Sequence, residues 1–501
     1  MNFMKRTLLL LPLALTMAAQ AQSTIPATTT DTTLRPITLS ATIEQALRHN
    51  FDVQIERYSP WLSQYDFRIA RAGYDPLFTA SGEHSYSKSI TSVTNYSTSY
   101  SDFLRSGISG SLPWGMSYDL QSALADNDGR NFSGTSSPFQ NSGGSEAFVK
   151  LTQPLLKNFW TDNTRLAISV AKNRIKFSEL ALQLQLMSTV TAVENAYYDL
   201  IFAQENVKVQ EKALQLAEQL FAENKKRVEV GVLAPLDEKQ AESQVAARRA
   251  DLLTAGQLLN TQQNLLKNLV TDDYASLHGI TLQPSEPLTA VPQTFSLQDS
   301  WNQGLTRRPD LLQAKLDIER AGIQLKYFKN QVFPQLDLFG TYGQAGSRSE
   351  FSGAINDIRD RNQPFYSYGI QLSIPLGNVA ARNRYKQGKV TVQQALLTTK
   401  KLEQDVMVQI DDAVKAAQAA FERVDATHQA SLYAAAALDA ERKKLENGKS
   451  TSFIVLQLQR DLTAASSDEI RALADYNKAL AQVAFAEAST LQRRKIDVTV
   501  K

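Results

Sequence analysis

Residues 162–228 form a stretch of 67 residues that contains neither proline nor glycine. At 1.5 Å per residue, such a stretch predicts a single helix about 100 Å long. Helices of globular proteins average about 12 residues, so this length favours a rod-like assembly over a compact domain. Residues 380–447 predict a second long helix, of 68 residues.

Each long helix is followed by a turn and a returning helix. Gly231 and Gly448 stand just past the two long helices, where glycine is favoured because it accepts a positive φ. Shorter helices are predicted over four ranges, 40–72, 235–270, 297–330 and 452–491. The two shorter helices of each half match the long one in combined length, so each long helix can run beside a stacked pair.

The same order of elements occurs twice. The segment ITLSATIEQALRHNFDV at 37–53 is matched by FSLQDSWNQGLTRRPDL at 295–311, and a shift of 258 places Leu39 on Leu297. The shift shrinks later in the chain because the first half holds an insertion of about 37 residues. The predicted organisation is a first repeat over 37–290, a second repeat over 291–490 and a C-terminal tail over 491–501.

Apolar residues recur along the long helices with the spacing of a coiled coil. In the first long helix, six of them are spaced by seven: Leu186, Val193, Leu200, Val207, Leu214 and Phe221. In the second, steps of three and four connect Met407, Ile410, Val414, Ala417, Phe421 and Val424. Both patterns predict a seam along which other helices pack.

Alternating strands are predicted between the helices of each half. Residues 366–376 alternate apolar with small or polar side chains over eleven positions, which is typical of a strand with one face in lipid. We predict its partner over 336–342 and a polar loop at 343–364. The first half offers an equivalent pair at 77–90 and 146–156, an inserted hairpin at 103–112 and 116–125, and a surface loop at 126–145.

One chain thus offers four strands, or six with the inserted hairpin. Four strands cannot close a barrel, for which about eight is the usual minimum, whereas three chains of four strands would close one of twelve. We therefore predict an α+β membrane protein, a homotrimer whose transmembrane β-barrel contacts outer-membrane lipid and continues into a helical coiled-coil tunnel. By alternation, Ile370 and Leu372 lie on one face of the barrel, and Gln371 and Ser373 on the other.

The N-terminus has the features of a secretory signal. Lys5 and Arg6 precede a short apolar stretch, and the sequence Ala-Gln-Ala ending at Ala21 fits a cleavage site. We predict a signal peptide over 1–21 and a flexible segment over 22–36. The apolar stretch is shorter than the roughly 20 residues that a membrane-spanning helix needs, and no later stretch qualifies.

Composition argues against several functions. Removal of Lys5 and Arg6 with the signal leaves 51 basic and 51 acidic residues, whereas a nucleic-acid partner would favour a basic excess. The chain has no cysteine, and its four histidines lack the spacing of metal ligands. It carries no nucleophile elbow and no phosphate-binding loop. We predict no nucleic-acid partner, no metal, no cofactor and no catalytic residues, hence no enzyme.

Over nearly all of 37–490, the chain resembles the TolC family of outer-membrane efflux proteins. The resemblance rests on the doubled helix openings, on strands that end in Pro-Leu at Pro154 and Pro375, and on two hairpin tips. The tips have the sequences RVEVGVLAPLDEKQAESQ (227–244) and LENGKSTSFIVLQLQRDL (445–462). The family implies a trimeric twelve-strand barrel continuous with a twelve-helix periplasmic tunnel. It also implies that the tip docks on a periplasmic adaptor protein fed by an inner-membrane transporter, for efflux or type I secretion.

The tip departs from the family pattern. Members of the family often close the tip with acidic residues on the second returning helix, but the matching positions here are Ile454 and Gln457. Asp237 keeps the acid expected in the first repeat, and it either faces the mouth or flanks the start of its helix. The predicted tip and gate residues are Asp237, Phe453, Ile454 and Gln457, with Gly231 and Gly448 at the turns. An alternative function, a structural or adhesive coiled-coil protein of the cell surface, explains the heptads but not the two matched sets of strands.

Overall fold

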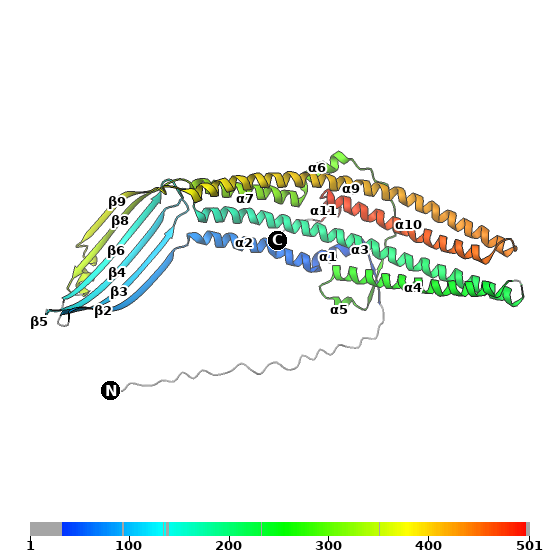
Figure 1. Cartoon of the computed structure of the whole chain (residues 1–501), viewed down its shortest axis with the longest axis horizontal. Helices are drawn as coiled ribbons and strands as arrows, with labels where there is room; N and C mark the ends of the chain where they lie inside the picture. Colours follow the sequence, from blue (N-terminus) through cyan, green and yellow to red (C-terminus); the bar gives the residue numbers. More distant parts are fainter. Residues whose placement is uncertain are drawn as a thin grey trace, which may run out of the picture.

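The computed structural model describes residues 33–92, 95–133, 135–136, 140–231, 233–349 and 351–496. This part of the chain is an elongated rod with strands at one end and helices along the rest (Figure 1). Within these ranges, no helix combines the length and hydrophobicity needed to cross a membrane. The predicted signal peptide over 1–21 lies outside the described residues.

The strands at the end of the rod form one antiparallel sheet. In spatial order the strands are β2 (Leu77–Ser92), β3 (Asn95–Ser111), β4 (Ser117–Ser133), β6 (Gln140–Pro154), β8 (Gln335–Arg348) and β9 (Pro364–Ser373), and the short β5 (Thr135–Ser136) pairs with β4. The two repeats meet where β6 pairs with β8, from Gly143 opposite Arg348 to Pro154 opposite Asp337. The sequence left open whether the chain has four or six long strands, and the described residues contain six.

Three expectations about this sheet are wrong. Residues 126–145 are not a surface loop, because β4 continues to Ser133 and β6 begins at Gln140. The strands over 77–90 and 146–156 are not neighbours, since β3 and β4 lie between them. Residues 343–364 are not a loop throughout, because β8 continues to Arg348 and helix α8 (Phe351–Arg359) follows. Backbone hydrogen bonds to adjacent strands, rather than hydropathy, sustain these polar extensions.

Helix α8 packs on one face of β6 and β8 near the end of the sheet far from the other helices. The Ser145 hydroxyl donates a hydrogen bond of 2.5 Å to the carbonyl oxygen of Ala354. The Arg348 guanidinium donates two bonds of 2.8 Å to the carboxylate of Asp357, which is buried together with Ala354. A bidentate pair of this kind fixes the orientation of the helix as well as its position.

Each predicted helix that precedes the sheet strands is broken once. Helices α1 (Leu39–His49) and α2 (Phe51–Arg71) are separated by Asn50, and α6 (Leu297–Arg307) and α7 (Pro309–Gln331) by Arg308. Asn50 caps α2, since its side-chain oxygen accepts from the amides of Asp52 and Val53. Pro309 disfavours helical backbone at the residue before it. The predicted continuous helices over 40–72 and 297–330 are therefore wrong at equivalent positions of the two repeats.

The two long helices are present as predicted. Helix α3 (Asn163–Glu229) has 67 residues and α9 (Val379–Glu446) has 68. The returning helices are α4 (Pro235–Val270) and α10 (Ser452–Ala486), and the remaining short elements are η1 (Ala72–Tyr74), α5 (Tyr274–Leu277) and α11 (Thr490–Arg493). Helix α10 ends earlier than the predicted 491, and Ala488 has a φ of 61°.

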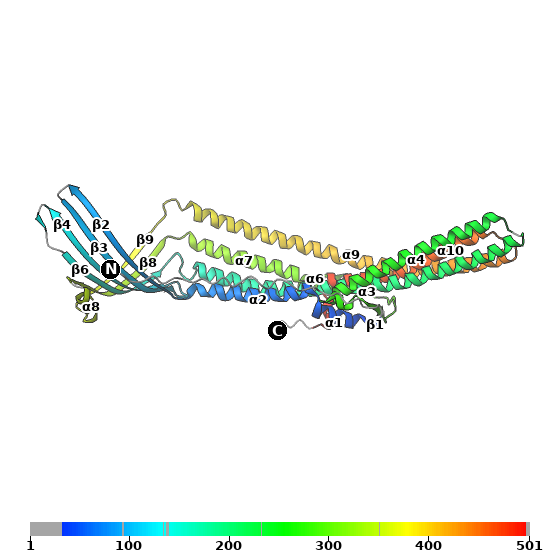
Figure 2. The same cartoon turned by 90° about the horizontal axis from the view of Figure 1, so that it is seen from below.

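The helices form a single curved layer. In the half nearer the sheet, they lie side by side in the order α2, α3, α7 and α9, and in the far half the order is α4, α3, α10 and α9 (Figures 1 and 2). Each long helix thus runs beside a stacked pair of shorter ones. At every level the layer is four helices wide, with α9 at one edge and α2 or α4 at the other.

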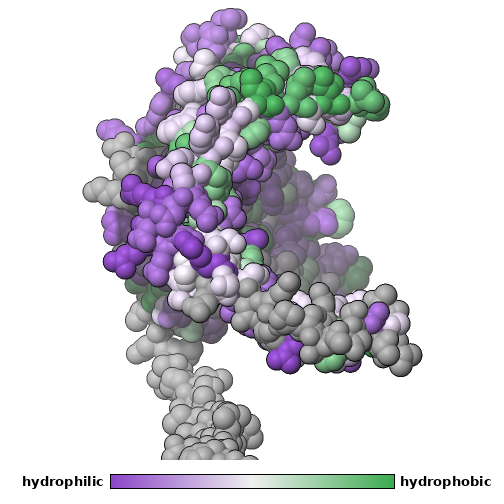
Figure 3. Space-filling view, turned by 90° about the vertical axis from the view of Figure 1, so that its left-hand side faces the viewer, coloured by the Kyte–Doolittle hydropathy of each residue, from purple (hydrophilic) through white to green (hydrophobic). Residues whose placement is uncertain are grey.

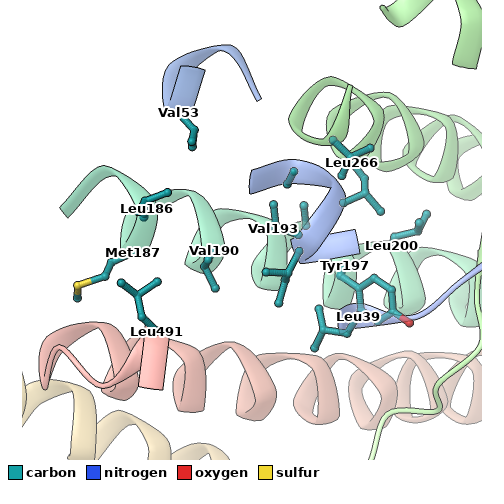
Figure 4. Packing of buried hydrophobic residues seen from close by; sticks show 14 of the residues in the cluster. Leu39, Val53, Leu186, Met187, Val190, Val193, Tyr197, Leu200, Leu266 and Leu491 are labelled. Atoms are coloured by element: carbon teal, nitrogen blue, oxygen red, sulfur yellow. The ribbon is translucent and has the colours of Figure 1, made fainter. Parts of the chain in front are cut away.

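The main hydrophobic core lies where the shorter helices stack (Figure 4). Val193, Tyr197 and Leu200 of α3 are fully buried there, among side chains that include Leu39 of α1 and Leu266 of α4. Beside this core, β1 (Thr33–Ile37) pairs in parallel with β7 (Ile280–Pro284), and the Tyr197 hydroxyl donates a bond of 3.2 Å to the carbonyl oxygen of Ile37. The prediction of a flexible segment is therefore wrong for residues 33–36.

The seam predicted on α3 holds in the core and then shifts. Leu186, Val193 and Leu200 are buried, but Val207, Leu214 and Phe221 are only partly buried. In the far half, burial passes to Ala213, Ala217, Leu220 and Asn224. In this half, α3 contacts both α4 and α10. Alanine side chains allow these helices to approach closely, so small residues occupy the buried face of α3 where the spacing of seven predicted larger ones.

Candidate functional site

Both hairpin turns lie together at the end of the rod opposite the sheet (Figures 1 and 2). Gly231 and Gly448 have φ angles of 79° and 69°, in the left-handed region that glycine adopts without steric cost. A Cβ at either position would meet no atom within 4 Å, so backbone conformation and not space requires glycine there. The two turns form the tip of the molecule.

A small apolar cluster holds the two hairpins together behind the tip. Its buried members come from three helices: Leu220 of α3, Leu438 and Leu445 of α9, and Val455 and Leu456 of α10. Because Val455 and Leu456 face this cluster, neighbouring residues of α10 at other helical positions must face outward.

A polar contact, which we call the tip clasp, joins the hairpins through Asn224 of α3. The hydroxyl of Ser452 donates a bond of 3.0 Å to the Asn224 side-chain oxygen, and both residues are buried. The Asn224 side-chain nitrogen lies 3.4 Å from the carbonyl oxygen of Asp237, at the start of α4. One asparagine therefore contacts the first turns of both returning helices. The Arg227 guanidinium adds a bond of 3.1 Å to the carbonyl oxygen of Leu445.

The structure places the four proposed gate residues on two neighbouring helix starts. Asp237 lies in the first turn of α4 and is partly buried, with its amide donating to Ala234. Phe453, Ile454 and Gln457 are exposed on one face of α10, with 57% of Phe453 and 40% of Ile454 accessible. Asn224 contacts both helix starts, through the carbonyl oxygen of Asp237 on α4 and the hydroxyl of Ser452 on α10.

Two carboxylates near the tip are paired within the chain. Hydrogen bonds from Lys444 and then Ser450 lower the pKa of the Glu441 carboxyl. A hydrogen bond from Lys239 lowers the pKa of Glu242 in the first turns of α4, at 2.7 Å. These carboxylates stay ionised and paired, and the exposed large apolar side chains at the start of α10 are Phe453 and Ile454.

The sheet at the other end has one apolar and one polar face. Residues opposite each other in antiparallel strands share a face, so the register sorts them. An apolar band crosses all six strands and includes Phe78, Leu104, Ile108, Leu120, Leu124, Val149, Leu151, Leu338, Tyr342, Ile370 and Leu372. The other face is polar and includes Thr79, Glu83, Arg105, Asp119, Gln121, Lys150, Thr341 and Gln371.

The apolar band is largely exposed in the single chain. Figure 3 looks at the strand end, where the chain is an arc open on one side, and apolar surface is concentrated at the top, on the β9 side. Ile370, Leu372 and Leu376 are all strongly exposed in this region. A continuous apolar face on strands of this length is suited to contact with lipid, and the polar face to an aqueous interior.

Sequence reasoning missed the tip clasp. Asn224 sits at a position of α3 where the helix is otherwise lined by Ala213, Ala217 and Leu220, and a buried asparagine on such a line calls for a partner. The buried position of Asn224 could not be recognised from the sequence, because the spacing of seven assigned other residues of α3 to the buried face. Ser452 and Asn224 are 228 residues apart, and only the packed helices bring them together.

Comparison with known proteins places the chain among export channels. The family profile "Outer membrane efflux protein" matches residues 42–271 and 301–487. The pyoverdine export outer membrane protein OpmQ of Pseudomonas aeruginosa is 23% identical over 341 residues, which is 68% of this chain and 69% of OpmQ. The outer membrane protein TolC of Vibrio cholerae is 22% identical over 342 residues, covering 66% and 75%.

The fold has solved relatives as well. The outer-membrane channel OprN aligns with a TM-score of 0.68 at 16% identity, over 90% of each chain. This likeness concerns the fold, while the two matched segments of the family profile correspond to the two repeats. The chain therefore belongs to the outer membrane efflux protein family, which includes TolC, and is a non-enzymatic export channel of the outer membrane with a periplasmic helical extension.

Proposed function

We propose that three copies of the chain form one passive exit duct, with the sheets closing a barrel in the outer membrane and the helices a periplasmic tunnel. The carrying observation is an exposed apolar seam on α2, at the edge of the helical layer. Its members follow steps of four and three: Phe51, Ile55, Tyr58, Leu62, Tyr65 and Ile69. A stripe of this spacing is suited to another helix, and the available edge of a second copy is α9.

The sheet supports the same assembly. Strands β2 and β9 are its edges, and within the described residues each pairs with another strand on one side only. Unpaired edges favour pairing with another strand. An exposed seam on one side of the arc and strand edges on both sides favour a ring of identical copies, for which the family provides the trimeric precedent.

Trimer formation and conduction test this proposal. Cross-linking in detergent extracts of outer membrane should yield a trimer, and the purified trimer should conduct ions in planar bilayers. The duct has no catalytic step, so conduction should need no added substrate or cofactor. A solubilised monomer that retains full conductance would contradict the proposal.

We further propose that the tip docks on a periplasmic adaptor protein fed by an inner-membrane transporter. The tip clasp and the apolar cluster behind it hold the hairpins together at rest, and the exposed Phe453 and Ile454 narrow the mouth. Opening then requires the hairpins to separate, which an adaptor can promote by binding the separated state more tightly.

Two proposals about the chain itself stand beside these. The signal peptide is cleaved after Ala21, and the two repeats span 37–290 and 291–490.

A triple variant tests the gate. Asp237→Asn, Phe453→Ala and Ile454→Ala together should widen the resting mouth by removing both apolar bulk and the remaining acid. Single-channel conductance of purified trimers should rise, and block by divalent cations added from the periplasmic side should weaken. Asp461→Asn, exposed farther along α10 and outside the four proposed gate residues, is the control and should change conductance less. Parental conductance and unchanged block in the triple variant would exclude these residues as the gate.

A further inference from the structure

The inserted hairpin of β3 and β4 is part of the main sheet and not an appendage. β3 pairs with β2 from Leu77 opposite Ser109 outward, and β4 pairs with β6 from Ser117 opposite Thr152 to Gly129 opposite Gln140. Without β3 and β4, the chain would supply only four long strands. With them, it supplies six in unbroken antiparallel order.

The hairpin also continues both faces of the sheet. Leu104 and Ile108 of β3, and Leu120 and Leu124 of β4, extend the apolar band, while Arg105 and Gln121 lie on the polar face. A hairpin that stood in water beyond the membrane would have no need of an apolar face in register with its neighbours. The pattern is that of wall strands.

The apolar band drifts relative to the strand register on the β9 side. The register runs in one row from Ala80 of β2 through Ala147 of β6 to Pro364 of β9. Leu104 and Ile108 flank this row on β3, whereas Ile370 of β9 lies six residues beyond it. The strands near β9 are therefore inclined to the band, as barrel strands are inclined in a membrane.

The hairpin widens the wall without adding a helix beneath it. In each copy, four chain connections join the sheet to the helices, at α2–β2, β6–α3, α7–β8 and β9–α9. The turn between β3 and β4 joins strand to strand at this end of the sheet, so the two added strands lengthen the wall alone.

We propose that the trimer closes a wall of eighteen strands, in which β2 of one copy pairs with β9 of the next. This inference rests on the proposed trimeric duct and replaces the twelve strands that the family resemblance implied. An even number of strands per copy keeps every pairing antiparallel, including the one between copies. The barrel diameter grows about linearly with strand number, so this wall is about half again as wide as one of twelve strands.

Cysteine accessibility tests whether the hairpin is in the wall, and the absence of native cysteine makes single substitutions clean reporters. Variants Leu104→Cys and Arg105→Cys on β3, and Leu120→Cys and Gln121→Cys on β4, would be labelled in intact outer membranes with a membrane-impermeant thiol reagent. Ile370→Cys and Gln371→Cys on β9 are the matched reference pair. We expect Arg105→Cys and Gln121→Cys to react at least tenfold faster than their apolar neighbours, as in the reference pair.

Electron cryomicroscopy of the detergent-solubilised trimer counts the strands directly. Eighteen strands with a β2–β9 seam would support the inference. A trimer with twelve wall strands, or equal labelling of all four hairpin variants beside an alternating reference pair, would overturn it and leave the proposed duct intact. A particle that is not a trimer would overturn both.

Discussion

At the scale of single residues, the tip depends on Asn224. Its side chain is buried and contacts the starts of two helices that belong to different repeats. A buried amide in this position is stabilising only while its partners are present, because an unpaired buried polar group costs about 1–3 kcal/mol. The clasp thus joins the two hairpins through hydrogen bonds of uncharged side chains and not through an ion pair.

Removing the Ser452 hydroxyl should loosen the clasp. In Ser452→Ala, the Asn224 oxygen loses its donor, so the free energy of unfolding should fall by about 1–3 kcal/mol and resting conductance should rise. The measurements are thermal unfolding of the purified trimer and single-channel recording. Thr451→Ala is the control, since Thr451 is exposed and its side chain makes no capping bond. If both variants shift stability and conductance equally, the clasp has no special role.

At the scale of elements, the sheet is organised by the difference between its faces. Strand β9 shows this most simply, with Leu372 exposed on the apolar face and Ser373 on the polar face. The faces are set by the strand period of two, so neighbouring residues face different solvents.

An arginine on each face of β9 should therefore act differently. Leu372→Arg places a charge in lipid and should impair membrane assembly, at a cost of about 2–4 kcal/mol near the midplane. Ser373→Arg places the same charge toward water and should be tolerated better. The yield of heat-resistant trimer in outer membranes measures both variants. Equal yields would show that the faces are misassigned.

At the scale of the whole molecule, the single chain leaves apolar surfaces and strand edges uncovered. Its layers are one helix and one strand thick, and the seam on α2 leaves large apolar side chains in water. Such surfaces mark interaction sites in soluble regions. In the proposed trimer, the copies cover one another's edges.

Charges in the α2 seam should prevent assembly while leaving the chain folded. Tyr58→Glu with Leu62→Glu changes two exposed positions, so the fold within one chain should persist, but the α2 edge can no longer pack on another helix. We expect a shift from trimer to monomer in size-exclusion chromatography with light scattering, and unchanged helix content by circular dichroism. Gln64→Glu, exposed on the same helix but outside the seam, should remain trimeric. A trimeric double variant would place the interface elsewhere.

Local sequence determined the helices and the repeat, because their signals act over a few residues. The absence of Pro and Gly set the length of α3, and Gly231 and Gly448 marked its end and that of α9. The sequence also contains signals for the breaks, because Asn50 is a capping residue and Arg308 precedes a proline. The prediction missed both breaks because the helical pattern continues on either side of them.

Only the tertiary structure decided what depends on distant partners. The polar ends of β4, β6 and β8 are strands because neighbouring strands satisfy their backbone groups, which hydropathy cannot report. The buried face of α3 includes Ala213 and Asn224, and not the residues spaced by seven, because α4 and α10 both pack against α3. The pairing of β6 with β8 depends on distant partners in the same way, because it joins strands from the two repeats. The hairpin of β3 and β4 is local, and alternation predicts both strands, but hydropathy alone does not report that they pair with β2 and β6.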